Sequence, residues 1–324
     1  MKKLTSVLLG TLLLVSVGAM GPAQAALTTQ CVGEAGAVTV PGDLVVPAGK
    51  ACSLTGTTID GNVRVAAGAD LVADGITVTG NVNVQADGYL DLTGSAVAGN
   101  VINRGAYGVY LDGTALNAYT ATAAVNPDTF LSSHGSSFTG RVAVGGGSFL
   151  LESSTVDRFV DVNEAYYADV LDSVIGGALT VAGNEYGAMV CGSEVDGHAS
   201  FSSNDYGVQL GAGGSLGVCQ QGSSVWGGNV TVSDTTGAVQ VTDNIVRGDL
   251  GGAGNTTVTA SDNRVRGELQ GQFAEQTQQR AMRMQLDARA GAQADAARDA
   301  VDALREERLG QAEQLAELAG PAGL

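Results

Sequence analysis

The sequence predicts an all-β fold, a right-handed single-stranded parallel β-helix of about twelve coils of roughly 19 residues, followed by an α-helical tail. Three observations support this fold class. A Gly-Asn-Val phrase recurs at a fixed spacing, apolar residues alternate around it with a period of two, and the composition changes near residue 271. Short strands that recur in this way bury their apolar faces by stacking on one another, as in a solenoid.

A glycine marks the same position in successive coils. The phrase Gly-Asn-Val begins at Gly61, Gly80 and Gly99, at intervals of 19 residues. The interval from Gly197 to Gly228 is longer than one coil by about 11 residues, which indicates an inserted loop between two coils.

The residues around each marker predict strands. The position two residues before the marker is apolar throughout: it is occupied by Val40, Ile59, Val78, Val97, Phe138, Val156, Ile175, Val195, Trp226, Val246 and Val265. The positions two and four residues after it are also mostly apolar, so the period is that of a strand with one buried face. We therefore expect Val97 to point inward and Asn81 outward. Parallel connections of this kind favour a right-handed winding.

The chain divides into three segments by composition. Residues 1–25 are typical of a signal peptide, because Lys2 and Lys3 precede an apolar stretch that ends at Ala23-Gln24-Ala25. Residues 26–270 form the expected β-helix with an N-terminal cap, and residues 271–324 form the expected helical tail. We expect no transmembrane segment, because the apolar stretch near the N-terminus is short for a membrane span.

The tail is rich in Ala, Gln, Glu and Arg, which are strong helix formers. Val301, Leu304, Leu315 and Leu318 indicate an apolar stripe, although Arg308 interrupts the strict heptad. Two interpretations stay open. The helix folds back and caps the open end of the rod, or it is a docking tail for self-association.

The coil Val-Thr-Gly-Asn-Val-Asn-Val at 78–84, followed by Gly88-Tyr89-Leu90, resembles the coils of right-handed β-helix proteins that bacteria secrete. Many of those proteins have no known activity. The coils also partly resemble those of bactofilins, which polymerise into filaments but lack a signal peptide and coil more tightly. The resemblance spans residues 38 to about 270 and implies a fold more strongly than a function.

The net charge is −17, which argues against nucleic acid and anionic lipid as partners because both require basic surfaces. The four cysteines are an even number in a chain with a secretory signal, which favours disulfides. Cys31 and Cys52 are about one coil apart, and Cys191 and Cys219 are one coil plus the insertion apart. We expect these two pairs, the first closing the N-terminal cap and the second fastening the insertion.

No residue is predicted to be catalytic and none to hold a metal, although the acidity leaves Ca²⁺ open as a ligand. His134 lies in Ser-Ser-His-Gly-Ser-Ser, which is typical of a loop, and both His134 and His198 are interpreted as surface residues. Asp243 and Asp262 precede Arg247 and Arg266 in a repeated Asp-Asn-x-Val-Arg-Gly phrase. These residues are expected to be turn residues with exposed ion pairs, with a carboxylate–arginine lyase site as the alternative.

Tyr166, Tyr186 and Tyr206 follow one another at intervals of 20 residues and should stack along one edge of the rod. Such a ladder stabilises neighbouring strands, and it is also a surface on which sugars bind.

The function expected from these observations is that of a secreted or envelope-associated rod with a structural or adhesive role and no enzymatic activity. The first alternative is a lyase or hydrolase acting on an acidic polysaccharide, and the second is a carbohydrate-binding module. The expected partners are an extracellular polysaccharide or a second copy of the chain, bound through the helical tail.

Overall fold

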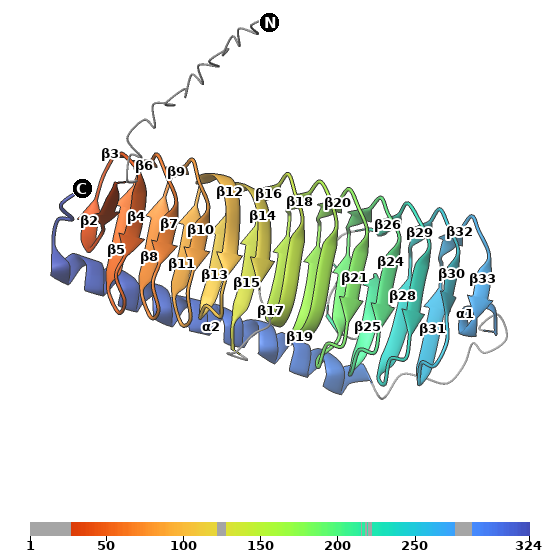
Figure 1. Cartoon of the computed structure of the whole chain (residues 1–324). Helices are drawn as coiled ribbons and strands as arrows, with labels where there is room; N and C mark the ends of the chain where they lie inside the picture. The colour runs from red at the N-terminus through yellow and green to blue at the C-terminus, as the bar shows by residue number, and fades with distance from the viewer. Residues whose placement is uncertain (1–26, 122–127, 215, 218, 220–221, 276–286) are drawn as a thin grey trace, which may run out of the picture.

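The computed structural model describes residues 27–121, 128–214, 216–217, 219, 222–275 and 287–324; the expected signal peptide at 1–25 lies outside them. The protein is a parallel β-solenoid of about twelve turns with a long C-terminal helix, which confirms the predicted fold class. Figure 1 shows the strands in successive turns along a straight rod, with the helix lying lengthwise against its side.

Each turn contributes strands to three parallel stacks. The first stack is β1 (Thr28–Gln30), β4 (Asp43–Val46), β7 (Val63–Val65), β10 (Val82–Val84), the second parts of β12 (Ala96–Asn103) and β14 (Ala115–Ala121), the first parts of β17 (Val142–Glu152) and β19 (Val160–Leu171), β21 (Leu179–Ala182), β24 (Ala199–Ser202), β27 (Val230–Ser233), β30 (Leu250–Gly252) and β33 (Leu269–Gly271).

The second stack lies beside the long helix. It is β2 (Gly33–Ala35), β5 (Ala51–Thr55), β8 (Asp70–Asp74), β11 (Tyr89–Thr93), β13 (Gly108–Asp112), β15 (Phe130–His134), the second parts of β17 and β19, β22 (Ala188–Cys191), β25 (Gly207–Gly211), β28 (Ala238–Thr242) and β31 (Thr257–Ser261).

The third stack is made of two-residue strands and the first parts of two longer ones. It is β3 (Thr39–Val40), β6 (Thr58–Ile59), β9 (Thr77–Val78), the first parts of β12 and β14, β16 (Ser137–Phe138), β18 (Thr155–Val156), β20 (Val174–Ile175), β23 (Glu194–Val195), β26 (Val225–Trp226), β29 (Ile245–Val246) and β32 (Arg264–Val265).

The inner core of the rod consists of columns of mostly aliphatic side chains, with aromatic residues such as Phe149 and Trp226 in some turns. Val63, Val82 and Val101 are paired in register in the first stack, and all three are at most 1% exposed. Val97 is buried as predicted. The alternation of the sequence therefore identifies the inward side chains correctly, because each turn repeats the strand positions of the turn before it.

The marker glycines are required by the close approach of successive turns. A Cβ atom added to Gly99 would lie 2.5 Å from the carbonyl oxygen of Gly80, closer than real Cβ contacts. The asparagine after the marker forms a ladder along the rod. The side-chain oxygen of Asn62 accepts a hydrogen bond from the backbone N–H of Asn81, and that of Asn81 accepts one from the N–H of Asn100, both at 2.9 Å. Asn81 is consequently half-buried, not simply outward as predicted.

Both disulfides have the expected partners. Cys31 is bonded to Cys52 with Cα atoms 5.6 Å apart, and Cys191 is bonded to Cys219 with Cα atoms 5.5 Å apart. The second bond fastens the insertion over the second stack, where the side-chain oxygen of Gln209 accepts the N–H of Leu216. Two disulfides indicate an oxidising compartment.

Two helices follow the last strand, and they have different roles. In α1 (Gln272–Glu275), Phe273 is buried in the inner core, so this short helix covers the end of the rod. The long α2 (Asp287–Ala319) runs back along the second stack (Figure 1). Pro321 beyond it forms a β-bridge with Glu34 in the first turn. The tail therefore folds back as one interpretation expected, but it covers the side of the rod instead of its open end.

The face of α2 that contacts the rod includes only part of the predicted stripe, because Val301 is buried and Leu304 packs against buried tyrosines. Leu315 and Leu318 are 48% and 77% exposed, whereas Ala312 and Ala316 are buried. The inward residues recur every three or four positions: they are Arg298, Val301, Arg305, Arg308, Ala312 and Ala316. Small alanines let the helix backbone approach the first turns closely. Among the described residues, no helix is long and apolar enough to cross a membrane.

Between α2 and the rod lies a second buried layer, here called the outer layer. Its apolar residues are Tyr89, Phe130, Tyr167 and Val301, with Tyr107, Tyr110, Tyr166, Tyr186 and Leu304 packed against them. Its charged residues are three aspartates of the second stack, each paired with an arginine of α2: Asp70 with Arg308 at 2.8 Å, Asp91 with Arg305 at 3.3 Å, and Asp169 with Arg298. The outer layer thus fastens α2 to the second stack at two adjacent turns, those of Asp70 and Asp91, and at the turn of Asp169 further along the rod.

Candidate functional site

The three predicted tyrosines lie side by side along one edge of the rod. Tyr166 belongs to β19, Tyr186 precedes β22 and Tyr206 precedes β25, so each is one turn further along. The ring centroids of Tyr166 and Tyr186 are 6.0 Å apart, and those of Tyr186 and Tyr206 are 5.2 Å apart, with tilts of 41° and 44°. We call these three residues the tyrosine ladder.

Buried asparagines hold the turns that carry the tyrosine ladder. The side-chain oxygen of Asn184 accepts the N–H of Ala165 from the previous turn, and that of Asn204 accepts the N–H of Asn184. Because both asparagines are almost fully buried, these hydrogen bonds satisfy backbone groups that water cannot reach. The asparagines of the phrases Asn184-Glu185-Tyr186 and Asn204-Asp205-Tyr206 therefore hold the turns before Tyr186 and Tyr206 in place.

Exposure increases along the tyrosine ladder. Tyr166 and Tyr186 are half-buried against the outer layer, and Tyr206 is 40% exposed. Tyr206 also has a φ of 60°, in the left-handed region that residues with a Cβ rarely adopt. Its ring consequently projects from a tight turn at the free end of the ladder.

An exposed carboxylate accompanies each tyrosine. Glu164, Glu185 and Asp205 occupy successive turns, and the negative charge of Glu185 raises the pKa of the Tyr186 hydroxyl. An aromatic face beside a hydrogen-bond acceptor can hold the apolar face of a sugar ring and one of its hydroxyls. The arrangement can therefore bind a polyhydroxylated chain that lies along the rod.

The repeated phrase Asp-Asn-x-Val-Arg-Gly, which begins at Asp243 and Asp262, forms turns. Asp243 and Asp262 have φ values of 58° and 57°, and the Asp243 carboxylate accepts the hydroxyl of Ser223. The neighbouring Asn244 donates its side-chain amide to the carbonyl of Leu210 and so links successive turns. These contacts explain the phrase by turn geometry, and they do not favour the lyase alternative.

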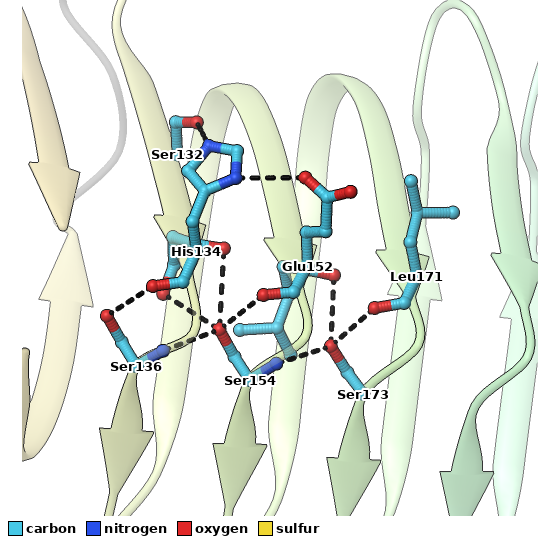
Figure 2. A network of polar contacts seen from close by, with 9 residues as sticks. Ser132, His134, Ser136, Glu152, Ser154, Leu171 and Ser173 are labelled. Atoms are coloured by element: carbon cyan, nitrogen blue, oxygen red, sulfur yellow. Dashed lines mark hydrogen bonds and ion pairs between the residues drawn. The ribbon is translucent and has the colours of Figure 1, made fainter. Parts of the chain in front are cut away.

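The two histidines have different surroundings. His198 is exposed as expected, and its Nδ1 accepts the backbone N–H of Asn229 at 3.0 Å. His134 is the last residue of β15, so the predicted loop at this position was wrong. Figure 2 shows its ring between two side chains: the Ser132 hydroxyl lies 2.8 Å from Nε2, and the Glu152 carboxylate lies 2.9 Å from Nδ1.

Sequence reasoning missed both this cluster and the aspartates beneath α2. Ser132 and His134 alternate within one strand, and Glu152 occupies the paired position of the next turn. That signal was present in the sequence, but an assignment of the segment to a loop concealed it. The described residues contain no group of three or more His, Cys, Asp or Glu side chains that could hold a metal ion.

Comparison with known proteins supplies no assignment. No protein-family description, no curated protein and no solved structure matches the chain. The architecture and the geometry of its side chains are therefore the basis on which a function is proposed.

Proposed function

We propose that the protein is a secreted or envelope-associated rod with a structural or adhesive role, and that the tyrosine ladder is its contact surface for an extracellular polysaccharide. The observation that carries this proposal is the stacking of three tyrosine rings at 6.0 and 5.2 Å along the rod axis. A polymer lying parallel to the axis meets the rings in succession. Weak contacts to single sugars then add up along the chain.

The charge of the surface favours a neutral polysaccharide. Glu164, Glu185 and Asp205 place a carboxylate on every step of the ladder, and the whole chain carries −17. Like charges across an interface oppose association, so a polyanion would be repelled. Neutral hydroxyls, in contrast, can donate hydrogen bonds to these carboxylates.

The two disulfides and the predicted signal peptide support export. Disulfides form and persist in oxidising compartments. N-terminal sequencing of protein recovered from the medium or the envelope tests this part of the proposal. We expect the exported chain to begin at Ala26, and exported chains that keep Met1 would contradict it.

The tyrosine ladder is tested by binding to immobilised neutral and acidic polysaccharides. Tyr206→Ala should abolish most of the binding seen with the parent, because Tyr206 is the most exposed ring. Phe159→Ala is the matched control, since Phe159 is another exposed aromatic residue, at 39%, outside the ladder. Binding that Tyr206→Ala leaves intact and Phe159→Ala removes would place the contact surface elsewhere. A parent that binds no polysaccharide in the panel would refute the adhesive role on glycans.

A further inference from the structure

Ser132, His134 and Glu152 form a linear chain of polar contacts on the outer side of the second stack. Ser132 and His134 are alternate residues of β15 and so project to the same side of the strand. Glu152 ends β17 and is paired in register with His134. Figure 2 shows the imidazole between the hydroxyl and the carboxylate, at 2.8 Å from the first and 2.9 Å from the second.

The carboxylate determines which ring nitrogen carries the proton. An ionised Glu152 can only accept, so Nδ1 of a neutral His134 donates to it. Nε2 then has a free lone pair and accepts the hydroxyl of Ser132. This is the arrangement in which an imidazole acts as a general base toward a serine while a carboxylate orients the ring.

The neighbouring serines in Figure 2 show what a purely structural serine does in this fold. The hydroxyl oxygens of Ser154 and Ser173 each accept a backbone N–H from the preceding turn, at 3.1 and 3.0 Å, and each hydroxyl donates to a backbone carbonyl. These hydrogen bonds connect successive turns. The hydroxyl of Ser132 is directed instead to an imidazole, and no role in turn-to-turn backbone bonding accounts for that contact.

Helix α2 covers this cluster. Val301 packs in the same layer as Phe130, the preceding outward residue of β15. The guanidinium of Arg305 lies 3.4 Å from the ring centre of Tyr110, which is the register partner of Ser132. Ser132 is in consequence only 2% exposed, although it faces away from the inner core. His134 and Glu152, nearer the edge of the stack, have side chains that are 27% and 42% exposed.

We propose that Ser132, His134 and Glu152 form a serine nucleophile, general base and orienting acid for the cleavage of carboxylic esters, held latent beneath α2. In the first step, the Ser132 oxygen forms a bond to the ester carbonyl carbon and its proton passes to Nε2 of His134. The ester C–O bond breaks, and the alcohol leaves with that proton. Water then attacks the acyl-serine, which releases the carboxylic acid and restores the Ser132 hydroxyl.

A fluorophosphonate probe tests the nucleophile directly. The Ser132 oxygen forms a bond to phosphorus, the P–F bond breaks, fluoride leaves and His134 takes the hydroxyl proton. The double variant Arg305→Ala/Arg308→Ala removes two of the ion pairs that hold α2 and changes no residue of the rod. We expect peptide mass spectrometry to find the adduct on Ser132, formed faster than in the parent as α2 is released. Hydrogen exchange of the α2 amides measures that release, and Val301→Asp is a second variant that loosens the helix.

Substitutions within the cluster separate a reactive serine from an exposed one. In the double-variant background, His134→Ala should lower the labelling rate by about 100-fold or more, the usual range for loss of a general base. Glu152 is a positioning residue. Glu152→Gln should slow labelling although it keeps a hydrogen-bond acceptor, and Glu152→Asp should restore part of the rate. His198→Ala is the matched control and should leave labelling unchanged, because His198 bonds a backbone N–H of another turn.

Two results would overturn the proposal. The first is an unmodified Ser132 in a variant whose α2 amides exchange freely while the strands stay protected. The second needs no variant. During prolonged reaction of the unaltered chain, transient undocking of α2 should make Ser132 the first serine modified, so earlier modification of Ser136 or Ser154 would refute a special reactivity at Ser132.

Discussion

The inner core and the outer layer are both buried, but they differ in composition and in the sequence distance between the residues in contact. The inner core is mostly aliphatic, and its side chains pack on residues of the next turn, in most turns about 19 positions away. The outer layer combines tyrosines, aspartates and arginines, and its contacts join residues such as Arg308 and Asp70, which are 238 positions apart. The contacts of the inner core follow from the repeat, whereas those of the outer layer depend on the fold of the whole chain.

This difference shows what each layer contributes. Burial of uncharged aliphatic surface gives the rod its stability and needs no particular partner beyond the next turn. Burial of a carboxylate is costly unless a partner of opposite charge accompanies it, so the outer layer is selective about what docks on it. Only a helix that presents arginines at the right intervals satisfies Asp70, Asp91 and Asp169 together.

The largest effect is expected from a charge placed in the inner core. Val97→Asp buries a carboxylate with no partner and should lower the free energy of unfolding by about 3 kcal/mol or more. The control is Ala96→Asp, because Ala96 is the exposed neighbour on the same strand. Similar melting temperatures for the two variants would show that the inward and outward positions of β12 are exchanged.

A smaller effect is expected from breaking one ion pair of the outer layer. Asp169→Ala leaves Arg298 without its buried partner, and it should destabilise the docking of α2 by about 2 kcal/mol, less than a fully buried pair because Arg298 can turn toward solvent. Hydrogen exchange should show faster exchange in α2 and unchanged exchange in the strands. Asp295→Ala is the control, since Asp295 bonds the same arginine but is 65% exposed. Equal effects of the two substitutions would mean that burial of the partner is unimportant.

Loss of one hydrogen bond of the asparagine ladder should lower the free energy of unfolding by less than the loss of an ion pair. Asn81→Ala removes the acceptor for the N–H of Asn100 and should cost about 1 kcal/mol. Asn83→Ala, at a position that is half-buried like Asn81 but lies outside the ladder, should change stability by less than about 0.5 kcal/mol. Chemical denaturation measures both, and a larger loss for Asn83→Ala would contradict the ladder.

The smallest effect is expected from pH. Burial raises the pKa of the Asp70, Asp91 and Asp169 carboxyls, while the paired arginine opposes the shift in each. A carboxyl with a raised pKa in the folded state binds protons more readily when folded than when unfolded. Stability therefore falls as pH rises through the interval between the ordinary and the raised pKa.

We accordingly expect the melting temperature not to decrease when the pH is lowered from 7 to 5. The variant Asp91→Asn/Asp169→Asn should show a flatter dependence on pH, because two of the three carboxyls are gone. A steep loss of stability of the parent over this interval, absent from the variant, would mean that the ionised aspartates stabilise the docked helix more than burial opposes their charge.

The inner core could be predicted from the sequence because it repeats. The regular spacing of Val63, Val82 and Val101 predicts their pairing, and spacings close to one turn place Cys31 beside Cys52 and the tyrosine rings beside one another. The outer layer could not be predicted in this way. Nothing local in the sequence relates Arg298 to Asp169, and Leu315 and Leu318 suggested a different helix face from the one that Ala312 and Ala316 present.

The surroundings of His134 could be predicted from the sequence in part, less well than the inner core and better than the outer layer. Its pairing with Glu152 follows from the repeat once β15 is recognised as a strand, but serines and a glycine around it are also typical of turns. The burial of Ser132 depends on α2 and so on contacts distant in the sequence. Local composition therefore identified neither the strand nor its cover.

The lengthwise position of α2 also bears on how such a rod can change during evolution. Solenoids commonly gain or lose turns by duplication and deletion, since each turn contacts only its neighbours. Here a helix of 33 residues, about 50 Å long, is fastened to the turns of Asp70, Asp91 and Asp169, and Pro321 beyond it meets Glu34 in the first turn. Removing one turn between these points would shift the remaining aspartates by about 4.8 Å relative to their arginines. The positions of the arginines on α2 therefore limit how many turns lie beneath the helix. That number can change only if the helix changes as well.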